Sequence, residues 1–172
     1  MKTTFAVPVL ILCIALLAGI VSAQSPARPT PADLAQLMRG IIFTNSNVVF
    51  FAQDQNPDEV NPDKKPALSP NPLTSVFGKW QAVENSALAL AESASLLMLP
   101  GRTCSNGVKV PVADPTWVKM VQDMREAGLT AYKAAQSKNQ DNILSAAEVV
   151  NNSCENCHRK YRQKPKAADR CR

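Results

Sequence analysis

Histidine is almost absent from this chain of 172 residues, in which His158 is the only one. No Ser-His-Asp or paired-carboxylate arrangement can be argued from the remaining residues, so we expect a protein that is not an enzyme. Aromatic residues make up only 5% of the chain, and few lie near its basic C-terminal end, which argues against nucleic-acid binding. No segment alternates apolar and polar residues, which argues against β-strands.

The N-terminal segment has the pattern of a secretory signal peptide. Lys2 supplies a positive charge, residues 5–20 are apolar or small, and a small-x-small cleavage site precedes Gln24. The apolar stretch is too short and wrongly flanked for a membrane span. We expect cleavage near Ala23-Gln24, export to the periplasm or its equivalent, and a single mature domain over residues 24–172.

The formal net charge of +5 is concentrated at the C-terminus. Residues 159–172 contain seven Lys and Arg residues against Asp169 alone. This tail carries +6, and once Lys2 is set aside the rest of the chain carries −2. A basic tail on a slightly acidic body predicts a docking surface for an acidic partner, and a solvated tail that only maintains solubility is the alternative.

Four segments have apolar residues at helical spacing, which predicts helices over 31–53, 73–98, Pro115 to a turn at 138–139, and 140–163. Their inner stripes include Leu34, Met38, Ile41, Ile42 and Val49 in the first helix, interrupted by Asn45; Val76, Trp80, Val83, Ala87, Leu90, Ala94 and Leu97 in the second; Trp117, Val121, Met124, Gly128, Ala131 and Ala135 in the third; and Ile143, Ala147, Val150, Cys154, Cys157 and Tyr161 in the fourth.

The connections between these helices are defined by proline and glycine. Thr30 is the expected N-cap of the first helix, with Pro31 at its first position. Five prolines between residues 54 and 72 predict a long loop, and Pro100-Gly101 ends the second helix. Four amphipathic helices without strands predict an all-α, antiparallel up-down-up-down four-helix bundle.

The motif with the most specific chemistry is the Cys-x-x-Cys-His run formed by Cys154, Cys157 and His158. This is the attachment pattern of a c-type haem, in which two thiols form thioethers with the vinyl groups and the imidazole binds the iron. On a helix these three residues share one face within a single turn, so they can reach one macrocycle. The sequence therefore predicts one covalent haem c.

Two other interpretations of the cysteines stay open. A Cys₄ zinc site formed by Cys104, Cys154, Cys157 and Cys171 would have irregular spacing. A redox dithiol formed by Cys154 and Cys157 would lack the βαβ context of thioredoxin-like proteins. Either interpretation would remove haem from the protein.

If haem takes two thiols, Cys104 and Cys171 remain, and an exported protein is expected to pair them as a disulfide. In an up-down-up-down bundle both cysteines lie at the end where His158 lies. The same topology brings Met38 to that level, with Met98 and Met120 nearby. The haem is thus expected at one end of the bundle, with the disulfide holding the tail beside it.

A helical bundle with this motif on its last helix resembles the cytochrome c′ family, the class II cytochromes c. In low-spin members a methionine of the first helix is the sixth iron ligand, which here corresponds to Met38; high-spin members leave that position open and bind nitric oxide or carbon monoxide. The chain departs from the family where Leu34 occupies a position that often holds arginine, and in its proline-rich loop and its Cys104/Cys171 pair.

These residues predict the following site. His158 is the proximal iron ligand and Met38 the distal candidate, because a thioether is a recognised haem donor; a core-filling role for Met38 is the alternative. Arg39 could pair with a haem propionate or remain a solvated helix residue. We expect one-electron transfer with an acidic redox partner, the alternative being a gas-binding protein for nitric oxide or carbon monoxide; a homodimer stays open.

Overall fold

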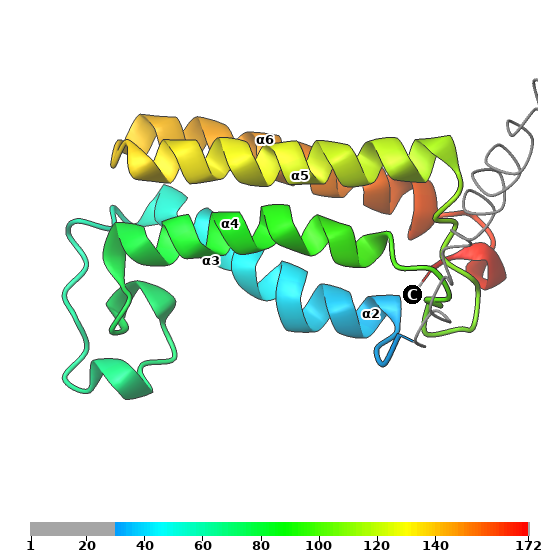
Figure 1. Cartoon of the computed structure of the whole chain (residues 1–172). Helices are drawn as coiled ribbons and strands as arrows, with labels where there is room; N and C mark the ends of the chain where they lie inside the picture. Colours follow the sequence, from blue (N-terminus) through cyan, green and yellow to red (C-terminus); the bar gives the residue numbers. More distant parts are fainter. Residues whose placement is uncertain (1–29, 172) are drawn as a thin grey trace, which may run out of the picture.

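The computed structural model describes residues 30–171, which fold into helices packed side by side (Figure 1). The predicted signal peptide lies outside the described residues. Within residues 30–171 there is no β-strand, only an isolated bridge between Thr103 and Lys109. The elements are α2 (Leu34–Leu37), η1 (Met38–Ile42), α3 (Phe43–Asp54), η2 (Pro66–Leu68), η3 (Pro72–Thr74), α4 (Lys79–Leu97), α5 (Pro115–Gln136), α6 (Gln140–Tyr161) and η4 (Ala167–Asp169).

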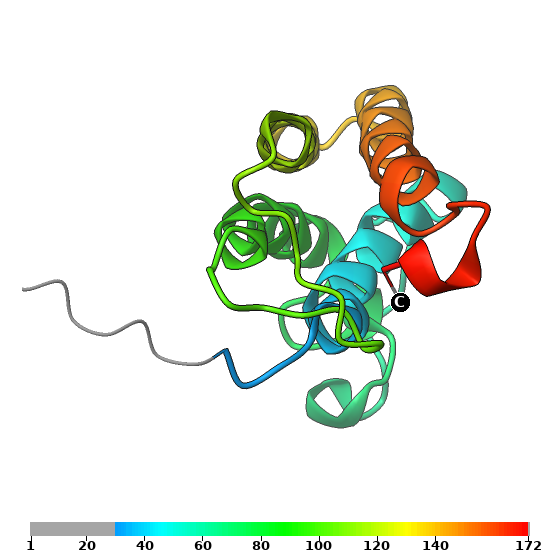
Figure 2. The ribbon, with the colours of Figure 1, turned by 90° about the vertical axis from the view of Figure 1, so that its right-hand side faces the viewer.

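The elements α2, η1 and α3 follow one another without a break and form one helix, which we call the first helix (residues 34–54). It contacts both α4 and α6, and α5 also contacts both of these helices from the opposite corner of the bundle (Figure 2). The indole nitrogen of Trp117, at the start of α5, donates to the carbonyl of Leu97 at the end of α4 over 3.3 Å. Gln140, at the start of α6, donates to the carbonyl of Ala52 near the end of α3 over 2.6 Å. The prediction of an all-helical bundle of four packed helices is therefore confirmed.

The seam between α4 and α5 is the most extensive helix–helix contact among the described residues. The predicted stripe of α4 is buried from Trp80 to Leu97, and that of α5 from Trp117 to Ala135. Gly128 allows the two helices to approach, because a Cβ there would lie 2.7 Å from the backbone nitrogen of Ala91. No side chain larger than hydrogen fits this position at the observed spacing.

Two predicted helix starts are wrong. The first helix begins at Leu34, and its N-cap is Asp33 and not Thr30, because Asp33 and Gln36 exchange side-chain-to-backbone hydrogen bonds in a capping box. The second helix begins at Lys79 rather than at residue 73. The chain instead forms the 3₁₀ turn η3 and folds tightly at Gly78, where a Cβ would collide with the carbonyl oxygen of Leu73.

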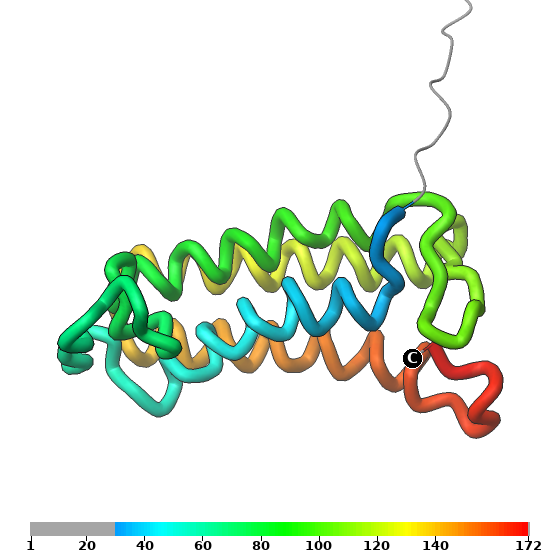
Figure 3. Tube along the Cα trace, turned by 90° about the horizontal axis from the view of Figure 1, so that it is seen from below, coloured from blue at the N-terminus to red at the C-terminus, as the bar shows by residue number. Residues whose placement is uncertain are grey.

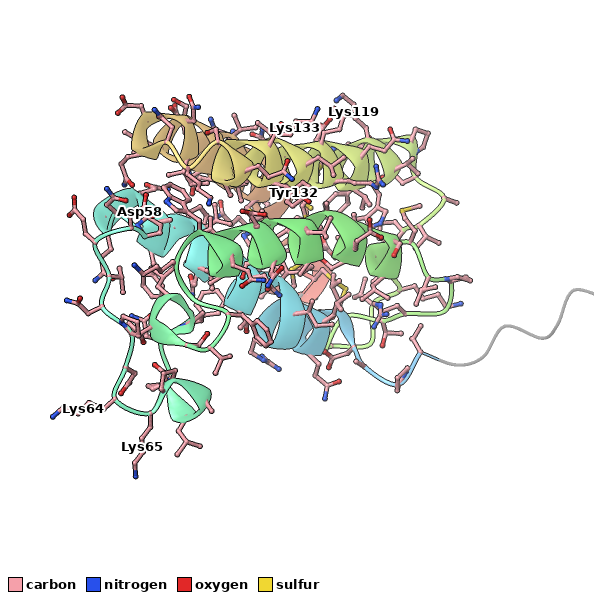
Figure 4. The ribbon with its side chains drawn as sticks, turned by 60° about the vertical axis from the view of Figure 1, so that its left-hand side comes forward. Asp58, Lys64, Lys65, Lys119, Tyr132 and Lys133 are labelled. Atoms are coloured by element: carbon pink, nitrogen blue, oxygen red, sulfur yellow. A yellow bond between two sulfur atoms is a disulfide. The ribbon has the colours of Figure 1, made fainter. Side chains whose placement is uncertain are left out.

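Because of this later start, Val76 lies outside the α4 stripe and is 62% exposed. The proline-rich loop packs at the end of the bundle opposite the C-terminus (Figure 3). It is tied to α4 by Lys79, whose ammonium donates to the carbonyl of Asp58 over 3.2 Å. Lys64 and Lys65 point outward from the edge of this loop (Figure 4). None of the helices in residues 30–171 combines the length and apolar character needed to cross a lipid bilayer.

Candidate functional site

A cavity of about 650 Å³ lies at the C-terminal end of α6, between this helix, the first helix and the start of α5. Its wall on α6 includes Cys154, Cys157 and His158, and its wall on the first helix includes Met38 and Arg39. The structure thus brings together every residue that the sequence assigns to the cofactor. The α5 wall is formed by Trp117, Met120, Val121 and Met124.

The two thiols and the imidazole occupy one turn of α6, which runs unbroken from Gln140 to Tyr161. Asn139 caps this helix by accepting the amide N–H of Asn142 over 3.0 Å. The preceding side chains of the stripe, Ile143 and Val150, are buried in the core, so the periodicity of α6 directs Cys154 and Cys157 to the inner side as well. Both cysteines are half-buried and neither forms a disulfide.

The electrostatics of the two thiols differ from those of a reactive dithiol. Burial raises the pKa of Cys154, an effect opposed by a hydrogen bond from Ser153. Burial also raises the pKa of Cys157 to about 11, with a smaller contribution from Cys154. Attacking thiols of dithiol oxidoreductases have pKa values lowered by nearby positive charge or a helix N-terminus. These thiols lie at a helix C-terminus and stay protonated at neutral pH, which disfavours the redox-dithiol interpretation.

His158 is half-buried at the edge of the cavity. Burial lowers its pKa below the ordinary value, and the positive charge of Arg162 lowers it further. The imidazole is therefore neutral at neutral pH, with an unprotonated ring nitrogen. This is the state in which histidine binds a metal ion.

On the first helix, Met38 is half-buried and packs against the core. Two further methionines, Met120 and Met124, line the same cavity from α5. Met98 packs against the core elsewhere and is not part of the cavity lining. The cavity therefore presents thioethers from two sides, and Met124 is a lining residue that sequence reasoning placed only in the core stripe.

Arg39 is exposed and lies on the cavity wall. Arg162, just beyond the end of α6, lies on the opposite wall and is also exposed. The ion pairs found among residues 30–171 are Lys119–Asp123 and Arg159–Glu155, so neither of these two arginines belongs to one. From the sequence, Arg162 was assigned only to the basic tail. Its position one helical turn after His158 could have indicated that it lies beside the site.

Two aromatic residues close the cavity at the end of the bundle. The rings of Trp117 and Tyr161 meet edge to face, with their centroids 5.0 Å apart. The hydroxyl of Tyr161 donates to Asp114 over 3.2 Å, and the other carboxylate oxygen of Asp114 accepts the amide of Thr116 over 2.9 Å. The backbone hydrogen bond lowers the pKa of Asp114, while burial raises that of Tyr161 to about 12. One carboxylate thus caps α5 and fixes the orientation of Tyr161.

The C-terminal tail returns to the bundle at this same end (Figure 3). Cys104 and Cys171 form a disulfide with their Cα atoms 5.1 Å apart, and Cys171 also lines the cavity. The amide of Cys171 donates to the carbonyl of Tyr161 over 3.0 Å, and the Asn106 side chain donates to the carbonyl of Arg170 over 2.8 Å. Cysteines that are joined in this way cannot act as thiolate ligands, which disfavours the Cys₄ zinc interpretation.

Among residues 30–171, the cavity included, no three or more His, Cys, Asp or Glu side chains are grouped so that they could hold a metal ion by themselves. The candidate site is the cavity that Cys154, Cys157 and His158 share with Met38. Comparisons with protein-family models, with curated proteins and with solved structures found no match to this chain.

Proposed function

We propose that this protein is an exported c-type cytochrome that carries one covalently bound haem and transfers single electrons. The observation that supports it most is that Cys154, Cys157 and His158 face one cavity from a single helical turn. The volume of this cavity, about 650 Å³, is within the range of roughly 300–1,000 Å³ that is typical of ligand and cofactor pockets. The donor set consists of two free thiols and one neutral imidazole, and all three groups are partly shielded from water.

In this proposal the chain is a member of the cytochrome c′ class, with its four helices antiparallel in up-down-up-down order. The contacts of Trp117 with Leu97 and of Gln140 with Ala52 support that order, because each joins the start of one helix to the end of another. They also support the position of the site at one end of the bundle.

Each residue has a stated role. A bound haem supplies the iron whose oxidation state changes. Cys154 and Cys157 would hold the group as thioethers, each S–H adding across a vinyl bond so that the sulfur bonds to one carbon and the hydrogen to the other. His158 would bind the iron, Met38 is the candidate for a second iron ligand, and Arg39 would pair with a propionate. Trp117 and Tyr161 exclude water from one end of the cavity.

The test is expression of the full chain in a bacterium that has a c-type haem maturation system. The purified protein should show the absorption spectrum of a c-type haem in alkaline pyridine, and the haem should resist extraction with acidic acetone. Cys154→Ala combined with Cys157→Ala should abolish covalent attachment. Asn152→Ala, at an exposed position of the same helix, is the matched control and should retain the haem. Zinc without haem in the wild-type protein would refute the proposal.

A second candidate function is the binding of nitric oxide or carbon monoxide at an open iron position. The observation that favours it is that apolar residues, Leu34 and Ile42, flank Met38 on the first-helix wall. Carbon monoxide titration of the reduced protein separates the two functions. A methionine–iron bond slows or blocks uptake, whereas an open position binds the gas at once.

The proposed redox partner has an acidic surface. Lys160 and Lys166 are exposed on the tail, and the disulfide holds that tail beside the cavity. The disulfide also agrees with maturation in the periplasm, which is an oxidising compartment. Electron transfer to an acidic redox protein should therefore slow as ionic strength rises. An unchanged rate would remove the electrostatic part of the proposal and leave the haem assignment intact.

A further inference from the structure

The first helix faces the cavity with a row of side chains that are spaced by four residues. The members of this row that line the cavity are Leu34, Met38, Ile42, Ser46 and Phe50. In a continuous α-helix, residues four apart are rotated by about 40° from one another, since each residue advances by about 100°. From Leu34 to Phe50 this rotation would reach about 160°. A regular helix could not direct both ends of the row to one cavity.

The row stays aligned because the helix contains a π turn, η1, over Met38–Ile42. The amide of Phe43 donates to the carbonyl of Met38, five residues earlier, instead of to the carbonyl four residues earlier. A π turn takes up more residues per turn than an α turn, so it rotates the row back. The consequence is visible at Ile41, which the sequence periodicity assigns to the core and which is 37% exposed.

Polar side chains just after the turn bond to its carbonyl groups. Thr44 Oγ1 donates to the carbonyl of Arg39 over 3.3 Å, and Asn45 Nδ2 donates to the carbonyl of Ile41 over 2.8 Å. Side chains that bond to the backbone in this way compete with the regular hydrogen-bond ladder of a helix. Gly40 lies within the turn, is exposed, and has open space around the position of a Cβ.

We propose that the π turn at Met38–Ile42 is a positioning element of the haem site: it takes up one extra residue of the first helix, so that Met38 stays in line with the residues that face the cavity after the turn. This inference rests on the proposed function for the presence of haem. The turn itself belongs to the polypeptide and exists with or without the cofactor. Thr44 and Asn45 hold it by satisfying carbonyl groups within it.

Deletion of Gly40 provides the test, because it removes the extra residue of the π turn. The Phe43 amide and the Met38 carbonyl are then four residues apart, so their hydrogen bond becomes that of a regular α-helix and Met38 keeps its direction into the cavity. In a helix without an extra residue, the same deletion would rotate Met38 by about 100° relative to the residues after it. Gly40→Ala keeps the chain length and is the matched control.

The readout is nuclear magnetic resonance of the reduced, haem-loaded protein with ¹³C-methyl methionine. A methyl group above a haem is shifted strongly by the ring, and Met38→Leu identifies the resonance of Met38. We expect a shifted Met38 methyl in the wild type, in Gly40→Ala and in the deletion variant. Loss of the shifted methyl in a folded deletion variant, or its absence from the wild type, would overturn the inference.

Two measurements cover the remaining outcomes. If the deletion variant does not fold, the full-length Met38→Leu/Leu37→Met variant must lack a shifted methyl, since position 37 does not line the cavity. A shifted methyl from position 37 would refute the assignment. The scalar coupling across the hydrogen bond between the Phe43 amide and the Met38 carbonyl detects the π turn even without haem. Its absence refutes the inference, whereas absence of haem alone refutes only the proposed function.

Discussion

Gly128→Ala should destabilise the bundle although alanine is the better helix former. The new Cβ would lie 2.7 Å from the backbone nitrogen of Ala91 and 3.1 Å from the carbonyl oxygen of Ala87. Ordinary contact begins near 3.4 Å, so α4 and α5 must separate by about 0.7 Å at this point. A gap of about 0.5–1 Å forfeits a quarter to a half of the dispersion energy of each affected contact.

Overpacking costs about 1–3 kcal/mol, and we take the upper part of that range, about 2–3 kcal/mol, because the new Cβ meets backbone atoms and not a flexible side chain. The higher helix propensity of alanine returns about 1 kcal/mol, so we expect a net loss of about 1–2 kcal/mol in the free energy of unfolding. Urea unfolding, followed by the helical signal in far-ultraviolet circular dichroism, measures this loss. Gly40→Ala is the control, because nothing lies within 4 Å of its new Cβ. If Gly128→Ala were as stable as the wild type, the close α4–α5 contact would be refuted.

Three other predictions concern the cavity end of the bundle. Cys104→Ser combined with Cys171→Ser opens a disulfide whose cysteines are 67 residues apart, and urea unfolding should show a loss of up to about 4 kcal/mol; an unchanged midpoint would mean that the bond does not constrain the chain. Tyr161→Phe removes the hydrogen bond to Asp114 and should cost about 0.5–1.5 kcal/mol. This reasoning is refuted if a double-mutant cycle with Asp114→Ala shows no coupling between the two positions. The pKa of Asp114 is lowered in the folded state. The ionised carboxylate therefore stabilises the fold fully above its ordinary pKa, and this stabilisation is lost as the pH falls through the lowered pKa. The stability of Asp114→Asn should fall less steeply with pH in that range, and an acid transition identical to that of the wild type would contradict this.

Much of the bundle follows from periodicity because its seams are simple. The stripes of α4 and α5 from Trp80 to Leu97 and from Trp117 to Ala135 repeat at heptad spacing and are buried as the pattern indicates. The start of α5 at Pro115 agrees with the sequence pattern, and Asp114 caps it by accepting the amide N–H of Thr116. These features depend on local chemistry and on one face of one helix.

The irregular parts depend on contacts that periodicity does not record. The π turn moves Ile41 outward, and Asn45 within an apolar stripe was its only trace in the sequence. The start of α4 is set by the tight fold at Gly78 against Leu73, which favours a 3₁₀ turn over an earlier helix. Both depend on backbone geometry over a few residues rather than on a repeating pattern.

The candidate site was largely predictable, because Cys154, Cys157 and His158 are adjacent in sequence and a helix places them together. Met38 was placed at the same end from topology alone, and it lines the cavity. Arg162 and Met124 were not assigned to the site. Whether such residues reach a cavity depends on how the helices are rotated against each other, which one sequence does not state.

The most direct test of the central claim is the mass of the intact, denatured, unreduced protein after export and treatment with a thiol-alkylating reagent. We predict a chain beginning at Gln24 that carries the added mass of one haem and no alkyl group, because two cysteines are thioethers and two form the disulfide. A bare chain with alkylated Cys154 and Cys157 would contradict the claim that these residues hold a haem.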